Sequence, residues 1–195
     1  MISGIQKQKA EVFLNFHQDE EILVLLNSWD IGSSKLIEAC GYKAIATTSM
    51  GIAASLGYPD SQVIQLSEMI EVITGIVNAV KVPVSVDIEA GYGNNINEII
   101  DSVKMIIATG IVGINIEDSI DLNPVLIDEM EFCERISAIR ALSDSLGFHL
   151  VINARTDSFY TSSGSLREKL SESIKRGNKY REAAWFHRNS DERNG

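Results

Sequence analysis

The feature that most constrains the fold is a regular alternation of short apolar runs with longer segments of helical periodicity. The runs span four to seven residues, as strands buried on both faces do, and the segments between them place apolar residues at helical spacing. Strands that alternate with helices in this way favour parallel βαβ units. The predicted strands are 22–26, 44–48, 82–88, 113–116 and 150–153, and the predicted helices are 5–16, 33–40, 66–80 with Ser67 as its cap, 96–108, 128–146 and 166–182.

Polar residues gather directly after each apolar run, at 27–30, 47–49, 87–89, 117–118 and 153–157. In a (β/α)₈ barrel these positions all converge on the C-terminal face, where active sites are built. The predicted fold class is therefore α/β, of the (β/α)₈ TIM-barrel type, incomplete, with about five to six βα units present. We expect a functional site at this end of the strands.

The last stretch breaks the pattern. A sixth apolar run is due after Glu182, but the chain turns polar and charged there. This divides the 195 residues into a partial barrel domain, 1–182, and an atypical C-terminal tail, 183–195. The change in composition leads us to expect a truncated or frame-shifted gene product.

The acidic balance excludes some classes of partner. The chain has 17 Lys and Arg against 27 Asp and Glu, a net charge of −10, so nucleic acid and anionic membranes would be repelled. The apolar runs are too short to span a membrane, and the N-terminus lacks the pattern of a signal peptide. We therefore expect a cytoplasmic protein, in which Cys40 and Cys133 are two buried free thiols.

Several carboxylates follow neighbouring strands. Asp87 and Glu89 are two positions apart, so on a strand they point to the same face, and the pair 117–118 ends the next strand. Carboxylates that meet at one barrel mouth repel one another unless a hard dication such as Mg²⁺ lies among them. The alternative is that they are separate solvent-facing acids or pair with lysines, although apolar flanks argue against full exposure.

A cation and an anion-binding group would together define a site for a small dianionic 2-oxo acid. Arg155 offers a planar, permanently charged fork that suits a carboxylate or phosphonate. Residues 47–49 offer hydroxyl and backbone N–H groups before a helix. The alternative for Arg155 is a salt bridge at the barrel rim with Asp157 or Glu117. A nucleotide-binding doubly wound domain ranks last, because the glycines at 91–93 complete no phosphate-loop motif.

Four segments in this order, 47–60, 86–93, 115–118 and 153–157, resemble the isocitrate lyase/phosphoenolpyruvate mutase superfamily. The resemblance implies an enzyme that depends on Mg²⁺, with Mn²⁺ as an alternative, and that breaks or forms C–C or P–C bonds of a small 2-oxo acid or phosphonate through an enolate. It places the metal at Asp87, Glu89 and Glu117. It assigns catalysis to Asp60 and Arg155, and substrate binding to Thr48, Ser49, Asn123 and Arg155.

The sequence departs from the lyases of this superfamily in one loop. The lyases carry a cysteine, lysine and histidine motif shortly after the Glu-Asp pair, and residues 119–126 contain none of these residue types. The resemblance is therefore greatest to the phosphonomutase-like branch. The family also exchanges a last helix between subunits, which implies a homo-oligomer. A second hypothesis is a catalytically inactive barrel remnant that self-associates to cover strand edges and apolar helix faces.

Overall fold

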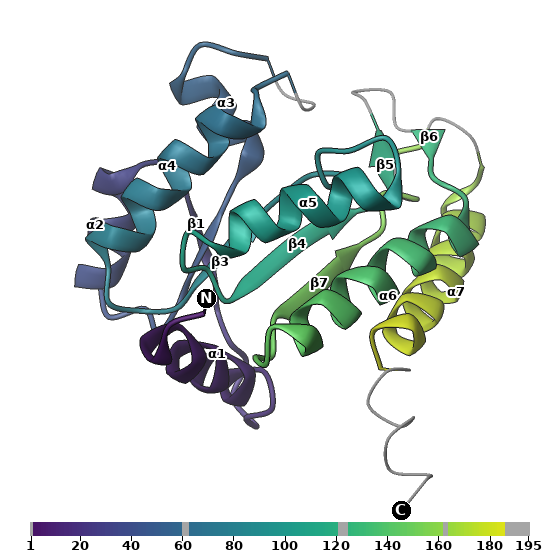
Figure 1. Cartoon of the computed structure of the whole chain (residues 1–195). Helices are drawn as coiled ribbons and strands as arrows, with labels where there is room; N and C mark the ends of the chain where they lie inside the picture. Colours follow the sequence, from purple (N-terminus) through teal and green to yellow (C-terminus); the bar gives the residue numbers. More distant parts are fainter. Residues whose placement is uncertain (1, 60–62, 121–124, 162–163, 186–195) are drawn as a thin grey trace, which may run out of the picture.

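The computed structural model describes residues 2–59, 63–120, 125–161 and 164–185, and its centre is a parallel sheet (Figure 1). The sheet has the order β1-β2-β3-β4-β7, so its strands lie side by side in the order in which they occur in the sequence. Its strands are β1 (Leu26–Ser28), β2 (Ile45–Thr47), β3 (Val84–Asp87), β4 (Gly113–Glu117) and β7 (Val151–Arg155). A separate antiparallel pair joins β5 (Ser119–Ile120) to β6 (Val125–Leu126). The predicted α/β fold of the TIM-barrel type is confirmed.

The helices are α1 (Gly4–Phe16), α2 (Ile31–Ala39), α3 (Ser49–Ser55), α4 (Leu66–Ala79), α5 (Ile96–Ile107), α6 (Glu129–Ser145) and α7 (Leu166–Trp185). Of these, α2, α4, α5, α6 and α7 cover one face of the sheet (Figure 1). Along that face α2 packs against α4, α4 against α5, α5 against α6, and α6 against α7 (Figure 1). The apolar positions predicted as core, namely Met69, Ile73, Ile106, Phe132 and Ile136, are all fully buried in this layer.

The helix α1 lies at the amino end of the strands, where it packs on Gly113 at the start of β4 (Figure 1). The amide of Gln6 donates to the carbonyls of Ile107 and Ile111 at 2.9 and 2.8 Å. A Cβ at position 113 would lie 2.7 Å from Cε1 of Phe13 and 2.8 Å from Oγ of Ser85. Only glycine leaves room for Phe13 at this point, so the amino end of the sheet is closed.

Three local predictions are wrong. The apolar run 22–26 is not a strand, because the sheet begins in register at Leu26 opposite Ile45, and Ile22 is 90% exposed. The helix α4 is capped by Gln65 and not by Ser67, because Gln65 and Glu68 form a reciprocal capping box. The thiols are free but not both buried: Cys40 is exposed at the end of α2, and Cys133 is half-buried.

The helix α7 continues across the predicted domain boundary at residue 182. It ends at Trp185, and Ala183 within it is buried. Residues 186–195 of the predicted tail lie outside the described residues. No helix in the described ranges is both long enough and apolar enough to cross a membrane.

Candidate active site at the carboxyl ends of the strands

A cavity of about 420 Å³ lies on the sheet face opposite α4 to α7, and Phe13 and His17 at the end of α1 also line it. The register aligns Asp87 with Asn115, and Asn115 with Asn153, and residues paired in this way project from the same face of a parallel sheet. The cavity is lined by polar side chains from every strand: Asn27, Thr47, Ser85, Asp87, Asn115, Asn153 and Arg155. Asp87 and Arg155 were predicted from the sequence as site residues, whereas Asn115 and Asn153 were not. The two asparagines could have been found because they pair with Asp87 across neighbouring strands.

The Asp87 carboxylate is held by donors from three segments. Its Oδ2 accepts from the backbone N–H and hydroxyl of Ser49 at 3.2 and 2.8 Å. Its Oδ1 accepts from Nδ2 of Asn115 at 3.0 Å and from the backbone N–H of Glu89 at 3.2 Å. Asn153 in turn donates to Oδ1 of Asn115 at 2.6 Å, which orients that amide. A carboxylate held so firmly presents its oxygens in one orientation, as a metal ligand or an electrostatic group requires.

Thr48 and Ser49 begin α3 directly beside Asp87. The Thr48 hydroxyl accepts from the backbone N–H of Gly51 at 3.3 Å and so caps the helix, while Ser49 is bound to the carboxylate. Both side chains were predicted from the superfamily resemblance to bind the anionic end of a substrate. In this structure they organise the start of α3 and fix Asp87.

Arg155 bridges two acids at the mouth of the cavity. Its Nη1 lies 2.9 Å from Oε2 of Glu117, and its Nε donates to Oδ1 of Asp157 at 2.6 Å. Both rim salt bridges offered as the alternative role of Arg155 are therefore present. They leave the arginine side chain 41% exposed, so an anionic ligand can still reach it.

Glu117 is half-buried among like charges. Its burial, followed by the negative charges of Asp157, Asp87 and Glu89, raises the pKa of the carboxyl to about 8 despite the opposing effect of Arg155. The backbone at Glu89 has a φ of 50°, and its buried carboxylate accepts from the hydroxyl of Tyr92 at 3.2 Å. A dication among Asp87, Glu89 and Glu117 would offset this excess of negative charge.

The donor set suits Mg²⁺ held by few protein oxygens. Asp87, Glu89 and Glu117 carry carboxylate oxygens, the kind of ligand that this ion prefers, and would hold it if it binds here. Among the residues with described positions, no three His, Cys, Asp or Glu side chains are gathered closely enough to hold a metal ion. This arrangement fits an ion that keeps several waters, rather than one enclosed by a cage of carboxylates.

Three acids or amides predicted for this site lie elsewhere or are not described. Asp118 was expected at the barrel mouth, but it is fully buried and receives donors from the segment after β7 and from α7. That expectation was wrong, because the side chain finds an arginine and a tyrosine far along the chain. Asp60 and Asn123 lie outside the described residues.

The sequence model of the phosphoenolpyruvate phosphomutase family matches residues 13–184. The chain belongs to this family. An uncharacterized protein of Mycobacterium tuberculosis strain H37Rv is 33% identical over 148 residues, which is 76% of this chain and 54% of the relative. The 2-methylisocitrate lyase of Escherichia coli K12 is 30% identical over 173 residues, which is 84% of this chain and 55% of the enzyme. The chain thus spans about half the length of these family relatives.

A solved structure of this superfamily superposes closely on the chain. A Burkholderia cenocepacia J2315 protein, provisionally described as a phosphonomutase, has a TM-score of 0.85 and 33% sequence identity. The match covers 91% of this chain and 71% of that protein. The family resemblance and the barrel-type fold inferred from the sequence are therefore confirmed.

Proposed function

We propose that this chain is a Mg²⁺-dependent lyase or mutase that acts on a small 2-oxo acid or phosphonate through an enolate. The observation that carries the proposal is that Asp87 and the partly exposed Arg155 line the same cavity. Ser49 and Asn115 hold the Asp87 carboxylate in place there. A cation bound at one side and an arginine at the other match the two charged ends of such a substrate.

The residues have separate roles in this proposal. Mg²⁺, or Mn²⁺, would be held by Asp87 with Glu89 and Glu117, and when bound it stabilises negative charge on enolate oxygens. Arg155 binds the carboxylate or phosphonate end of the substrate, beside Thr48 and Ser49. Asp60 as a catalytic residue and Asn123 as a substrate ligand rest on the superfamily resemblance alone.

The loop composition narrows the reaction. Because residues 119–126 contain no cysteine, lysine or histidine, we assign the chain to the phosphonomutase-like branch and not to isocitrate or methylisocitrate cleavage. Both the C–C and the P–C reaction fit the charges of the cavity. Incubation with oxaloacetate and with phosphonopyruvate, followed by NMR of the products, distinguishes the two reactions.

Thermal unfolding tests the site directly. Oxalate is a planar dianion that resembles the enolate of pyruvate, so Mg²⁺ and oxalate together should raise the melting temperature of the wild-type chain. Ligand at 100 times its dissociation constant adds about 2.7 kcal/mol to the free energy of unfolding. Asp87→Asn should abolish the shift, whereas Asp101→Asn, a control at an exposed acid on α5, should keep it. No shift in the wild type, or an equal shift in Asp87→Asn, contradicts the proposal.

One observation favours the second hypothesis, an inactive domain that self-associates. On α7, Leu166, Leu170 and Ile174 are spaced four residues apart and are 73, 50 and 57% exposed. A stripe of this kind is typical of a helix face that another protein surface covers. Light scattering decides the oligomeric state, and an oligomer without turnover or Mg²⁺-oxalate binding would favour this hypothesis. We place the chain in the cytoplasm in either case, in keeping with its two free thiols.

A further inference from the structure

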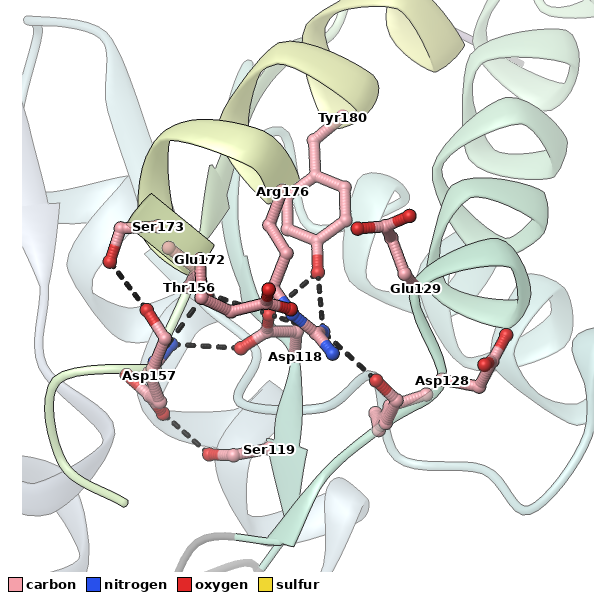
Figure 2. A network of polar contacts seen from close by, with 12 residues as sticks. Asp118, Ser119, Asp128, Glu129, Thr156, Asp157, Glu172, Ser173, Arg176 and Tyr180 are labelled. Carbon is pink, nitrogen blue, oxygen red and sulfur yellow. Dashed lines mark hydrogen bonds and ion pairs between the residues drawn. The ribbon is translucent and has the colours of Figure 1, made fainter. Parts of the chain in front are cut away.

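A buried carboxylate connects α7 to the rim of the candidate site (Figure 2). Asp118, at the end of β4, is fully buried and receives four donors. Two come from α7: Nη1 of Arg176 at 3.0 Å and the hydroxyl of Tyr180 at 2.6 Å. The other two come from the segment after β7: the Thr156 hydroxyl and the backbone N–H of Asp157, both at 2.8 Å.

The same segment holds Arg155. The Asp157 carboxylate accepts from the Ser119 hydroxyl at 2.5 Å through Oδ2, and from Nε of Arg155 at 2.6 Å through Oδ1. Thus Asp157 is fixed through its backbone by Asp118 and fixes Arg155 through its side chain. A continuous chain of polar contacts runs from α7 to the guanidinium at the cavity.

We infer that Asp118, together with Tyr180 of α7, positions the Arg155 guanidinium for binding of an anionic ligand. This inference rests on the proposed function, because it gives Arg155 the anion-binding role. Arg155 is a long and partly exposed side chain, whose rotamers would cost binding free energy to restrict. A rim held by a fully paired buried carboxylate removes part of that cost before the ligand arrives.

The arrangement of donors points to positioning as well as to anchoring of α7. Anchoring alone would need only Arg176 and Tyr180, and the apolar contact of Tyr180 with Phe132 already holds the helix, with ring centroids 4.7 Å apart. Thr156 adds nothing to that anchor, because it belongs to the rim and follows Arg155 directly. Asp118 therefore joins α7 to the residues that directly follow Arg155, whereas the contact of Ser158 with Ser173 joins α7 to the same segment further along.

The first test observes Arg155 without any ligand. In ¹H–¹⁵N spectra of the wild-type chain, the Nε–H of Arg155 should be shifted and slow to exchange with water, because it donates to Asp157. Tyr180→Phe and Thr156→Val each remove one hydroxyl at nearly constant volume, and each should speed this exchange at least threefold. Thr156→Ser restores a hydroxyl and should restore slow exchange.

A matched control separates positioning from loss of stability. Ser143 is also fully buried and bonded to the backbone at both sides, donating to the carbonyl of Phe148 and accepting from the N–H of Leu150. Ser143→Ala should lower the melting temperature while leaving the Arg155 signal unchanged. If Thr156→Val and Tyr180→Phe, or whichever of them folds, leave the exchange of the Arg155 Nε–H unchanged, the inference is wrong.

The second test uses calorimetry with Mg²⁺ and oxalate on the full chain. Tyr180→Phe should weaken oxalate binding roughly five- to tenfold, the coupling expected within one polar network. The same substitution in an Arg155→Lys background should have no further effect, because its action passes through the guanidinium. Equal effects in both backgrounds would mean that Tyr180 influences binding by a route other than Arg155, and would overturn the inference.

The two tests distinguish failure of the inference from failure of the proposed function. If the wild type binds no oxalate but the Arg155 signal responds to Tyr180→Phe and Thr156→Val, the site assignment fails and the coupling of α7 to Arg155 stands. If oxalate binds and requires Arg155, but neither variant changes binding or exchange, the site assignment stands and the inference fails.

Discussion

Ser49 donates both its backbone N–H and its hydroxyl to one oxygen of Asp87, at 3.2 and 2.8 Å. Hydrogen bonds to a charged group contribute about 1.5–3 kcal/mol, and Asp87 keeps its other donors when one is lost. Ser49→Ala should therefore lower the free energy of unfolding by about 1–2 kcal/mol. It should also reduce the thermal shift caused by Mg²⁺ and oxalate, because the carboxylate is less firmly held.

Urea unfolding and thermal shift measure the two effects of Ser49→Ala. The control is Ser55→Ala on the same short helix, whose hydroxyl donates to the carbonyl of Ile52 at 2.8 Å. That variant should bind Mg²⁺ and oxalate as the wild type does. A Ser49→Ala chain with an unchanged ligand response would show that Asp87 does not depend on this contact.

Arg155→Lys should weaken oxalate binding at least about tenfold, because a lysine cannot reproduce the planar fork. It should also destabilise the unliganded chain, since one ammonium cannot contact both Glu117 and Asp157 as two guanidinium nitrogens do. Titration calorimetry gives the affinity. Arg167→Lys, at an exposed arginine on α7, provides the comparison and should bind oxalate normally.

Gly113→Ala should lower the free energy of unfolding by about 1–3 kcal/mol, the usual cost of an overpacked core. The added methyl would meet Cε1 of Phe13 and Oγ of Ser85 at 2.7 and 2.8 Å, so α1 must shift. Gly177→Ala is the control, because a Cβ there has no neighbour within 4 Å. Similar denaturation midpoints for the two variants would contradict the close packing of Phe13 of α1 on Gly113.

The pH dependence of stability should include a contribution from Glu129. The hydrogen bond from Lys179 is the main cause that lowers the pKa of this carboxyl below its ordinary value, and the hydrogen bond from Lys175 adds to it. Burial acts in the opposite direction. The unfolded chain therefore binds the proton more readily than the folded chain. The stabilisation is present above the unfolded pKa of about 4.3 and is lost as pH falls through the lower folded value.

Urea unfolding of Glu129→Gln between pH 7 and pH 3 measures this contribution. The variant should be less stable than the wild type at pH 7, and the gap should close below pH 4. Glu134→Gln, at an exposed acid on the same helix, should follow the wild type throughout. A gap that stays constant with pH would assign the effect to packing instead of charge.

The barrel-type fold could be predicted because each strand is a short apolar run set between amphipathic helices. The bounds of β4 and α5 differ from prediction by a single residue at one end. The bounds of α3 were not predicted, since the seven residues that begin shortly after β2 show too few turns for a period to emerge. The run 22–26 misled because apolar content does not specify which residues pair in the sheet.

The site could be predicted only where polar residues follow a strand directly. Asp87 and Arg155 line the cavity, as expected from that position. The buried role of Asp118 could not be predicted, because its partners Arg176 and Tyr180 lie 58 and 62 positions away. The sequence around Asp118 does not reveal this pairing. Glu117 and Asp118 are adjacent acids, and nothing near them indicates which one is buried and which one faces the cavity.

The dependence of Asp118 on α7 also sets an order of events during synthesis. The sheet strands leave the ribosome before residues 176 and 180, so Asp118 must wait in the nascent chain without its arginine and tyrosine. Until then the carboxylate stays hydrated, because burial without its partners would cost free energy. The ligand-binding rim is therefore complete only once α7 has been translated and has docked on Asp118.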